Sequence, residues 1–244
     1  NFGGGVRLFG GRVSFVNSYI HDNTAPLGGG LYATQEDGYA PRANLTASDV
    51  YYNQALSGSG LGGGVYLREG ALSLTSDSDL IANNAIHGGG AYLITSTLTL
   101  DGDVSWIYNN TATGNGGGVY AQGSNVTMLD SAQLYNNTAE TGGGAYVDAS
   151  NLYGAKAAIR YNTASLRGGG VYATNSSVFD MDLGNYPCLG VRCSRLSNNT
   201  ATNLYGGGVY AANSVVDLRN TFIENNTADY GGGAYSESGA FEVT

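Results

Sequence analysis

The sequence predicts an all-β protein, a single right-handed parallel β-helix of about eight to nine coils. Three consecutive glycines occur nine times, and eight of these triplets run into an apolar residue and a tyrosine. An aliphatic residue three positions before an asparagine recurs at the same interval of about 26 residues, with two longer intervals. Repetition at this period is typical of a solenoid, in which each unit packs only on its neighbours.

One repeat, beginning at Gly116, illustrates the elements of a coil. It contains three short segments in which apolar and polar residues alternate, at 119–121, 126–128 and 134–136, and Gly, Ser, Asn and Asp residues separate them. Such alternation favours strands, and such separators favour turns. Each coil is therefore predicted to contain three short strands. The whole chain, 1–244, is predicted to be one continuous β-helix segment that is part of a longer solenoid.

The glycine and asparagine columns are predicted to form two different corners of the coil. Glycine is expected where the backbone needs a positive φ or where a Cβ has no room. Asparagine tolerates the left-handed backbone of a corner, and stacked amides can hydrogen-bond to one another along the rod. This predicted structural ladder consists of Asn23, Asn53, Asn83, Asn110, Asn137, Asn162, Asn199 and Asn226.

The tyrosines after the glycine triplets are predicted to face outward. Val6 and Leu8 flank Arg7 in the first such segment, so the position of Arg7 should lie outside and valines such as Val65 and Val119 inside. The opposite orientation, with the tyrosines inside, stays open. The outward orientation makes a contact ladder for flat glycans or a neighbouring rod from Tyr32, Tyr66, Tyr92, Tyr120, Tyr146, Tyr172, Tyr210 and Tyr235.

The composition disfavours two classes of partner. Nineteen acidic residues against ten basic ones give a net charge of −9, whereas nucleic acids and anionic membranes attract clustered lysine and arginine. No apolar run is long enough for a transmembrane helix. The two cysteines, Cys188 and Cys193, are expected to form a disulfide, which favours an extracellular or cell-surface location; a pair of free thiols is the alternative.

The two repeated elements resemble the motifs of the polymorphic outer membrane protein repeats, found in bacterial autotransporter passengers. They stand here as Gly-Gly-Gly-Val-Tyr or Gly-Gly-Gly-Ala-Tyr, and as Ile-Tyr-Asn-Asn or Leu-Tyr-Asn-Asn followed by Thr-Ala. The likeness extends over essentially the whole chain, although Ile, Leu or Val replaces the family's frequent Phe. It implies an exported, surface-exposed right-handed β-helix with a role in adhesion or surface architecture.

An enzyme is the rival interpretation, because polysaccharide lyases and hydrolases also use this fold. Their chemistry needs carboxylates placed for acid and base work. The weak candidates for such a cluster are Asp77, Asp79, Asp101, Asp103 and Asp130, in neighbouring coils but without a basic residue nearby. The histidines, His21 and His87, are expected to be surface residues. No catalytic residue, metal site or cofactor is otherwise predicted.

Seven Asn-x-Ser/Thr sequons could accept N-linked glycans, or could be a by-product of the repeated Asn-Asn-Thr motif. They are Asn44, Asn109, Asn125, Asn136, Asn175, Asn198 and Asn225.

Binding is expected to concentrate where insertions interrupt the repeat, at about 35–42, 57–61 and 182–194. The sequence as a whole predicts an extracellular structural or adhesive protein, a subunit or segment of a surface filament that self-associates through uncapped ends. The predicted partners are copies of itself or further repeats, and possible surface glycans. A polysaccharide-active enzyme and a carbohydrate-binding β-helix remain the alternatives.

Overall fold

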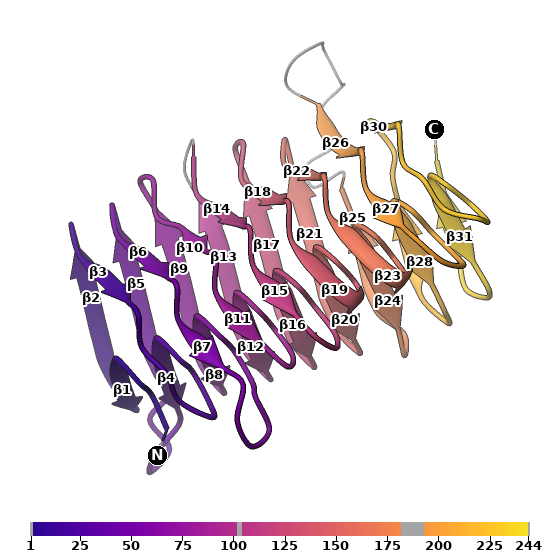
Figure 1. Ribbon diagram of the computed structural model, residues 1–244. Coiled ribbons are helices and arrows are strands. Elements are labelled where there is room, and N and C mark those ends of the chain that lie inside the picture. Colours follow the sequence, from indigo (N-terminus) through magenta and orange to yellow (C-terminus); the bar gives the residue numbers. More distant parts are fainter. Residues whose placement is uncertain (1, 102–103, 182–192, 244) are drawn as a thin grey trace.

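The protein is a parallel β-helix that forms an extended rod, with the N and C termini at opposite ends (Figure 1). The computed structural model describes residues 2–101, 104–181 and 193–243. Consecutive coils pair in register through parallel strands, about 4.8 Å apart. The predicted fold class is confirmed.

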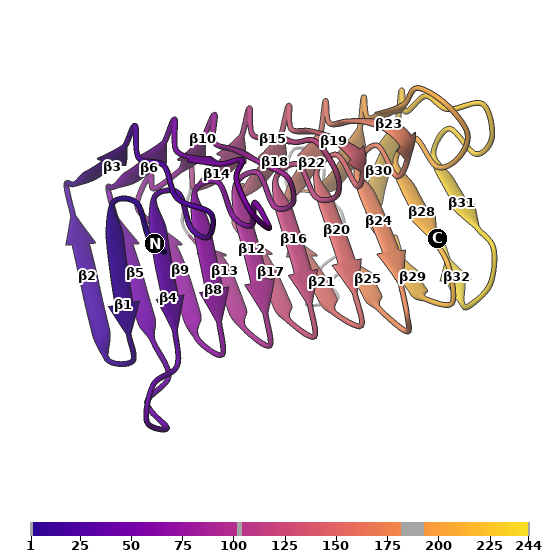
Figure 2. The same ribbon diagram turned by 60° about the horizontal axis from the view of Figure 1, so that its bottom comes forward.

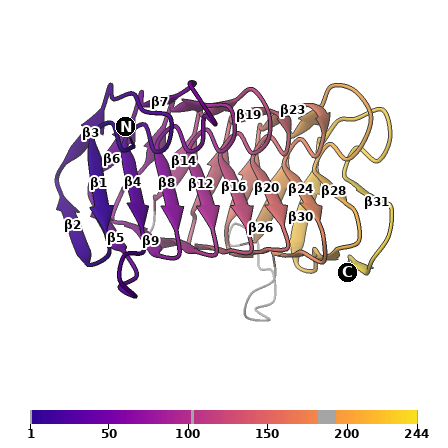
Figure 3. The same cartoon turned by 90° about the horizontal axis from the view of Figure 1, so that it is seen from below.

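Three long sheets run along the rod, as Figures 2 and 3 show from two further sides. Sheet A consists of β1 (Val6–Phe9), β4 (Leu31–Thr34), β8 (Val65–Arg68), β12 (Ala91–Ile94), β16 (Val119–Gln122), β20 (Ala145–Asp148), β24 (Val171–Thr174), β28 (Val209–Ala211) and β31 (Ala234–Ser236). Sheet B consists of β2 (Arg12–Val16), β5 (Arg42–Thr46), β9 (Ala71–Thr75), β13 (Thr97–Asp101), β17 (Asn125–Leu129), β21 (Asn151–Ala155), β25 (Val178–Asp180), β29 (Val215–Asp217) and β32 (Phe241–Glu242). Sheet C consists of β3 (Tyr19–His21), β6 (Asp49–Tyr51), β10 (Leu80–Ile81), β14 (Trp106–Tyr108), β18 (Gln133–Tyr135), β22 (Ala158–Arg160), β26 (Ser194–Ser197) and β30 (Thr221–Glu224).

A fourth, shorter sheet was not predicted. Sheet D consists of β7 (Gln54–Ala55), β11 (Asn84–Ala85), β15 (Thr111–Ala112), β19 (Thr138–Thr141), β23 (Thr163–Arg167) and β27 (Thr200–Ala201). Several of these strands have two residues, too few for an alternating pattern to be recognised in sequence. The expectation of three strands per coil is therefore corrected to four in the coils that contribute to sheet D.

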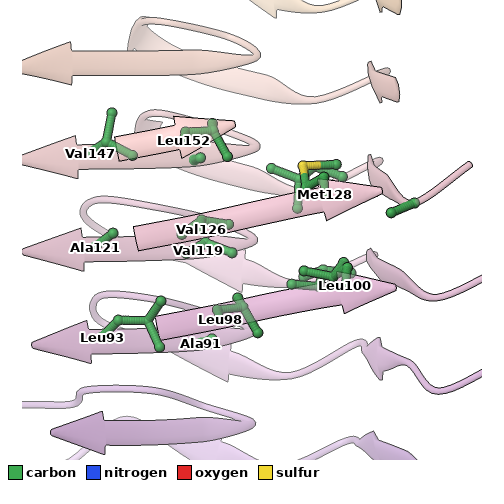
Figure 4. Close-up of a cluster of buried hydrophobic side chains, with 14 of the residues drawn as sticks. Ala91, Leu93, Leu98, Leu100, Val119, Ala121, Val126, Met128, Val147 and Leu152 are labelled. Carbon is green, nitrogen blue, oxygen red and sulfur yellow. The ribbon is translucent and has the colours of Figure 1, made fainter. Parts of the chain in front are cut away.

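The core is a stack of small and aliphatic side chains from the inner faces of the sheets. Figure 4 shows one part of it, where Leu98 and Leu100 lie one coil from Val126 and Met128. These four side chains are fully buried, as are Val65, Val119, Val171 and Val209 from sheet A. Buried and less buried residues alternate in strands such as β13 and β17, and this alternation separates the core from the outer surface.

The glycine triplets form the corner between sheets D and A, and the need for glycine can be explained at each of the three positions. The first has a positive φ in every triplet, for example +69° at Gly116. A Cβ on the second or third would strike backbone of a neighbouring strand: at Gly117 it would lie 2.6 Å from the Thr138 carbonyl oxygen, and at Gly118 2.6 Å from that of Gly144. The prediction that these corners need positive φ or exclude a Cβ is confirmed: both causes apply to the first glycine of a triplet, and the exclusion of a Cβ applies to the second and third.

Candidate functional site

The predicted asparagines lie in one column that leads from sheet C into sheet D. Asn137 is fully buried, and its Nδ2 donates to the Ile107 carbonyl (2.8 Å) and to Oδ1 of Asn162 (3.0 Å). Its Oδ1 accepts from the backbone N–H and the Nδ2 of Asn110, both at 3.0 Å. Side-chain contacts of the same kind join each successive pair from Asn23 to Asn226. The members from Asn53 to Asn199 are buried, so their contacts hold one coil to the next and are not available to a ligand.

The left-handed backbone expected at these asparagines belongs to the preceding residue, and that expectation is corrected. Asn109 and Asn136 have φ values of 57° and 53°, and Tyr52 and Tyr161 adopt the same conformation at the corresponding corners. The left-handed corner residue thus comes one position earlier than predicted, and this backbone turn directs the side chain of the following asparagine inward. The Asn-Asn pair thus combines two separate requirements, a left-handed corner and a buried amide.

Most of the sequon asparagines are exposed, on outer strand positions or corners. Asn198 is half-buried, and the exposed ones are Asn44, Asn109, Asn125, Asn136, Asn175 and Asn225. Neighbouring coils bring some of them together, since Nδ2 of Asn136 donates to Oδ1 of Asn109 at 2.7 Å. Their glycosylation stays a prediction.

The eight tyrosines stack on the outer side of sheet A. Neighbouring rings lie 4.5–5.8 Å apart and within 14° of parallel. They are more covered than expected, because Tyr66, Tyr92 and Tyr210 are only 6%, 8% and 1% exposed. Burial, with smaller effects of Tyr172 and Asp148, raises the pKa of Tyr146 to about 12. The row is therefore in large part a packing layer, and the contact role proposed for it has less free surface than the sequence suggested.

Residues before the glycine triplets provide part of this cover. The His87 ring lies 6.0 Å from the Tyr120 ring, and the Tyr205 ring lies 4.5 Å from that of Tyr235. The guanidinium of Arg167 lies 5.3 Å from the centroid of Tyr210. The period of the triplets predicts the tyrosine column, but it does not predict which side chains cover the tyrosine rings.

The carboxylates that the structure brings together are not the cluster predicted from the sequence: Asp79 lies beside Asp49. Asp79 is nearly buried and directly precedes β10 of sheet C; its Oδ1 accepts the backbone N–H of Trp106 at 2.7 Å, and its own N–H donates to Oδ1 of Asp49 at 3.2 Å. Burial raises the pKa of Asp79 to about 7, opposed by the Trp106 N–H and assisted by Asp49 and Asp77. Burial also raises the pKa of Asp49. Asp49 was not predicted, although it precedes Asp79 by one coil, just as Val50 pairs with Leu80.

The other predicted carboxylates lie elsewhere. Asp101 is exposed at the end of β13, and Asp130 lies 3.4 Å from Nζ of Lys156. Asp103 lies outside the described residues. Among the described residues no group of three or more His, Cys, Asp or Glu side chains is placed to hold a metal ion. The bonds from Asp49 and Asp79 to backbone N–H groups of the next coil support a structural role for this pair.

Stability is expected to fall as the pH rises, because the folded state holds a proton on Asp79. The raised pKa means that this contribution is complete below the unfolded value of about 3.8 and is lost as the pH rises through about 7. Asp79→Asn should remove this dependence and raise Tm at pH 8 by about 2–4 °C relative to wild type. Thermal melts of both proteins at pH 5 and pH 8 measure the difference. Asp101→Asn, which changes an exposed carboxylate, is the control; an equal pH dependence in Asp79→Asn and wild type would contradict the assignment.

The two histidines have local partners. Nδ1 of His21 lies 2.7 Å from Oδ2 of Asp22 at an exposed corner. Nδ1 of His87 accepts the backbone N–H of Asn115 at 3.0 Å, and burial lowers the pKa of His87. His87 is thus half-buried and holds a backbone corner, in contrast to the surface position expected for it.

The first two predicted insertions project from corners of the coil. Residues 35–41 join β4 to β5, where Glu36 and Tyr39 exchange backbone hydrogen bonds of 3.3 and 2.9 Å. Residues 57–61 lie between β7 and β8. Of the third, 182–194, only Cys193 and Ser194 lie among the described residues. Cys188 does not, so its pairing with Cys193 stays a prediction.

The chain was compared with known proteins. Residues 107–122 match the Chlamydia polymorphic membrane protein (Chlamydia_PMP) repeat. The matched stretch contains both repeated motifs, from Ile107 through Asn110 to the triplet and Tyr120. Searches of the curated proteins and of the solved structures each returned no match. With the β-solenoid architecture, the match confirms the predicted resemblance to this repeat family. Among the described residues, no helix has the length and apolar character needed to cross a membrane.

Proposed function

Because one stretch of this β-solenoid, residues 107–122, matches the polymorphic membrane protein repeat, we propose that this protein is a rigid structural and adhesive element of the cell surface. The kinship with a membrane-protein repeat supports a surface or outer-membrane-associated location. Adhesion and assembly into filaments are the finer parts of the proposal, and each has its own test.

The observation that carries the proposal is the continuous pairing of the coils in sheets A and B. Sheets A and B each contain nine strands paired in one direction, and the buried asparagines bond from coil to coil beside them. A solenoid held in this way is a stiff, extended scaffold. Its large outer surface suits presentation of binding groups at a distance from the cell.

The first and last described coils each leave strands unpaired on one side. Strands β1, β2 and β3 have a partner on one side only, as do β30, β31 and β32. Apolar side chains are exposed by 38–57% in the end coils: Phe2, Phe9, Val16, Phe222, Phe241 and Val243. Open strand edges with exposed apolar residues favour pairing. Further coils of a longer chain or the opposite end of a second copy can both satisfy them.

The purified 244-residue protein is expected to associate end to end into elongated oligomers that grow with concentration, because each end leaves strand edges unpaired and apolar side chains exposed. Size-exclusion chromatography with light scattering and negative-stain microscopy measure this. Phe241→Lys, which places a charge on the edge strand β32, should shift the distribution toward monomer. Tyr161→Lys on the side of the rod is the matched control. A monomer at every concentration would remove self-association from the proposal.

The adhesive part is tested separately. Beads coated with the protein are expected to bind host or neighbouring cells more than beads coated with heat-unfolded protein, because adhesion requires the folded surface. Equal binding of both bead types would contradict an adhesive role and leave the assembly result unaffected.

A further inference from the structure

The corner between sheets A and B contains a hollow beside the first insertion. Its volume is about 330 Å³, and it is lined by Ala40, Pro41, Arg42, Glu69, Gly70, Ala71, Thr95 and Thr97. The loop of residues 35–41 projects next to it, between β4 and β5 (Figures 2 and 3). The hollow therefore lies where the regular repeat is interrupted.

Two small residues create this hollow. In sheet B the first strand positions form a register column in which Arg12, Arg42, Ala71, Thr97 and Asn125 follow one another. Ala71 is the smallest member, so it leaves a gap between the longer side chains on either side. The preceding residue is Gly70, where the later coils have serines such as Ser96 and Ser124.

The first insertion explains why residue 70 is a glycine. A Cβ at position 70 would lie 2.5 Å from Cγ and 2.6 Å from the carbonyl oxygen of Pro41. The Pro41 carbonyl accepts the N–H of Ala71 at 2.9 Å, and the Gly70 carbonyl accepts the N–H of Thr97 at 2.9 Å. These bonds fix the backbone on both sides of the hollow, so its shape exists before any ligand enters.

Two arginines lie side by side at this corner. Arg12 and Arg42 lie directly opposite each other on adjacent strands, and like charges so placed are unfavourable. Both are exposed, and among the described residues neither forms an ion pair. Glu69, which also lines the hollow, is bonded to Nε of Arg68 at 3.3 Å. In a protein with net charge −9, two adjacent guanidinium groups that form no ion pair among the described residues are a local concentration of positive charge.

We propose that this hollow binds an acidic saccharide, with the carboxylate of a uronate unit on Arg42, while Arg12 on the neighbouring strand adds positive charge beside it. A guanidinium and a carboxylate form paired, charge-assisted hydrogen bonds. The hydroxyl groups of Thr95 and Thr97, on the opposite wall, and the carboxylate of Glu69 offer partners for sugar hydroxyls. The site gives the adhesive role a substrate class, yet it does not require end-to-end assembly.

Isothermal titration of the whole protein with trigalacturonate tests the site. Binding is expected for trigalacturonate and not for maltotriose, its uncharged counterpart, and it should weaken as salt is raised. Arg42→Ala should weaken binding about tenfold or more through loss of the charge-assisted bonds. Arg195→Ala, which removes a guanidinium from sheet C, should leave the affinity within about twofold.

A second variant tests whether binding depends on the shape of the hollow as well as on its arginines. Ala71→Asn introduces a residue that the same column already holds at Asn125 and Asn151, so folding is preserved while the hollow is filled. It should weaken binding as strongly as Arg42→Ala. Absence of trigalacturonate binding, equal binding of maltotriose, or equal binding of inorganic phosphate alone would overturn the proposal. Because this test measures a ligand on the isolated protein, its failure is distinguishable from failure of the cell-adhesion or assembly tests.

Discussion

Asn137→Ala is expected to lower the free energy of unfolding by roughly 2–5 kcal/mol, because two buried backbone groups lose a partner and each costs about 1–3 kcal/mol when unpaired. The N–H of Asn110 loses its acceptor, and the carbonyl of Ile107 loses the Nδ2 donor. The amides of Asn110 and Asn162 also lose their contacts with residue 137. No water reaches these groups to compensate, since all three asparagines are fully buried. Urea denaturation followed by circular dichroism measures the loss.

Asn136→Gly is the matched control for this change. Asn136 is exposed and has a φ of 53°, a conformation that glycine adopts without strain. Its replacement should cost less than about 1 kcal/mol. Equal losses from Asn136→Gly and Asn137→Ala would mean that the buried amide column contributes nothing specific to the stacking of coils.

Gly117→Ala is expected to destabilise the protein by at least about 3 kcal/mol, the upper part of the range for overpacking. The added methyl group would lie 2.6 Å from the carbonyl oxygen of Thr138 and would also strike that of Gly143. Both obstacles are backbone atoms of neighbouring strands, so no side-chain rotation relieves the contact. Urea denaturation gives the loss of stability, and hydrogen exchange shows whether the opening spreads from sheets A and D.

Gly123→Ala separates this steric effect from backbone strain. Gly123 has a positive φ of 55°, but no atom lies within 4 Å of its missing Cβ. Its replacement should therefore cost only about 1 kcal/mol. A loss at Gly123 that matched the loss at Gly117 would show that backbone conformation, and not the close approach of coils, explains the glycine triplets.

The sequence was sufficient to predict the architecture because each coil repeats the same pattern of strands and corners. The triplet at Gly116 and the asparagine at 137 mark corners that recur in every coil, and the alternation within Val119–Gln122 identifies the inner face. A single copy would have been ambiguous. Because the motifs recur with a common period, they predict one fold consistently, although each copy alone is a weak indication.

The features that escaped prediction depend on contacts between coils or on segments too short to carry a pattern. Sheet D was missed because a two-residue strand such as Asn84–Ala85 has no periodicity. The cover over the tyrosine row and the link from Asp49 to Asp79 required the exact register of neighbouring coils, which the insertions shift. The site beside Arg42 was missed for the same reason, since Arg12 and Ala71 become its neighbours only in three dimensions.

The asparagine column also has a consequence for how the chain can fold. Its inter-coil bonds join residues only 25 to 40 positions apart, even where an insertion separates the coils. Low sequence separation of contacts favours rapid folding, and none of these bonds requires the distant end of the chain. A chain that becomes available progressively from one end can therefore acquire its structure coil by coil, with each finished edge as the template for the next.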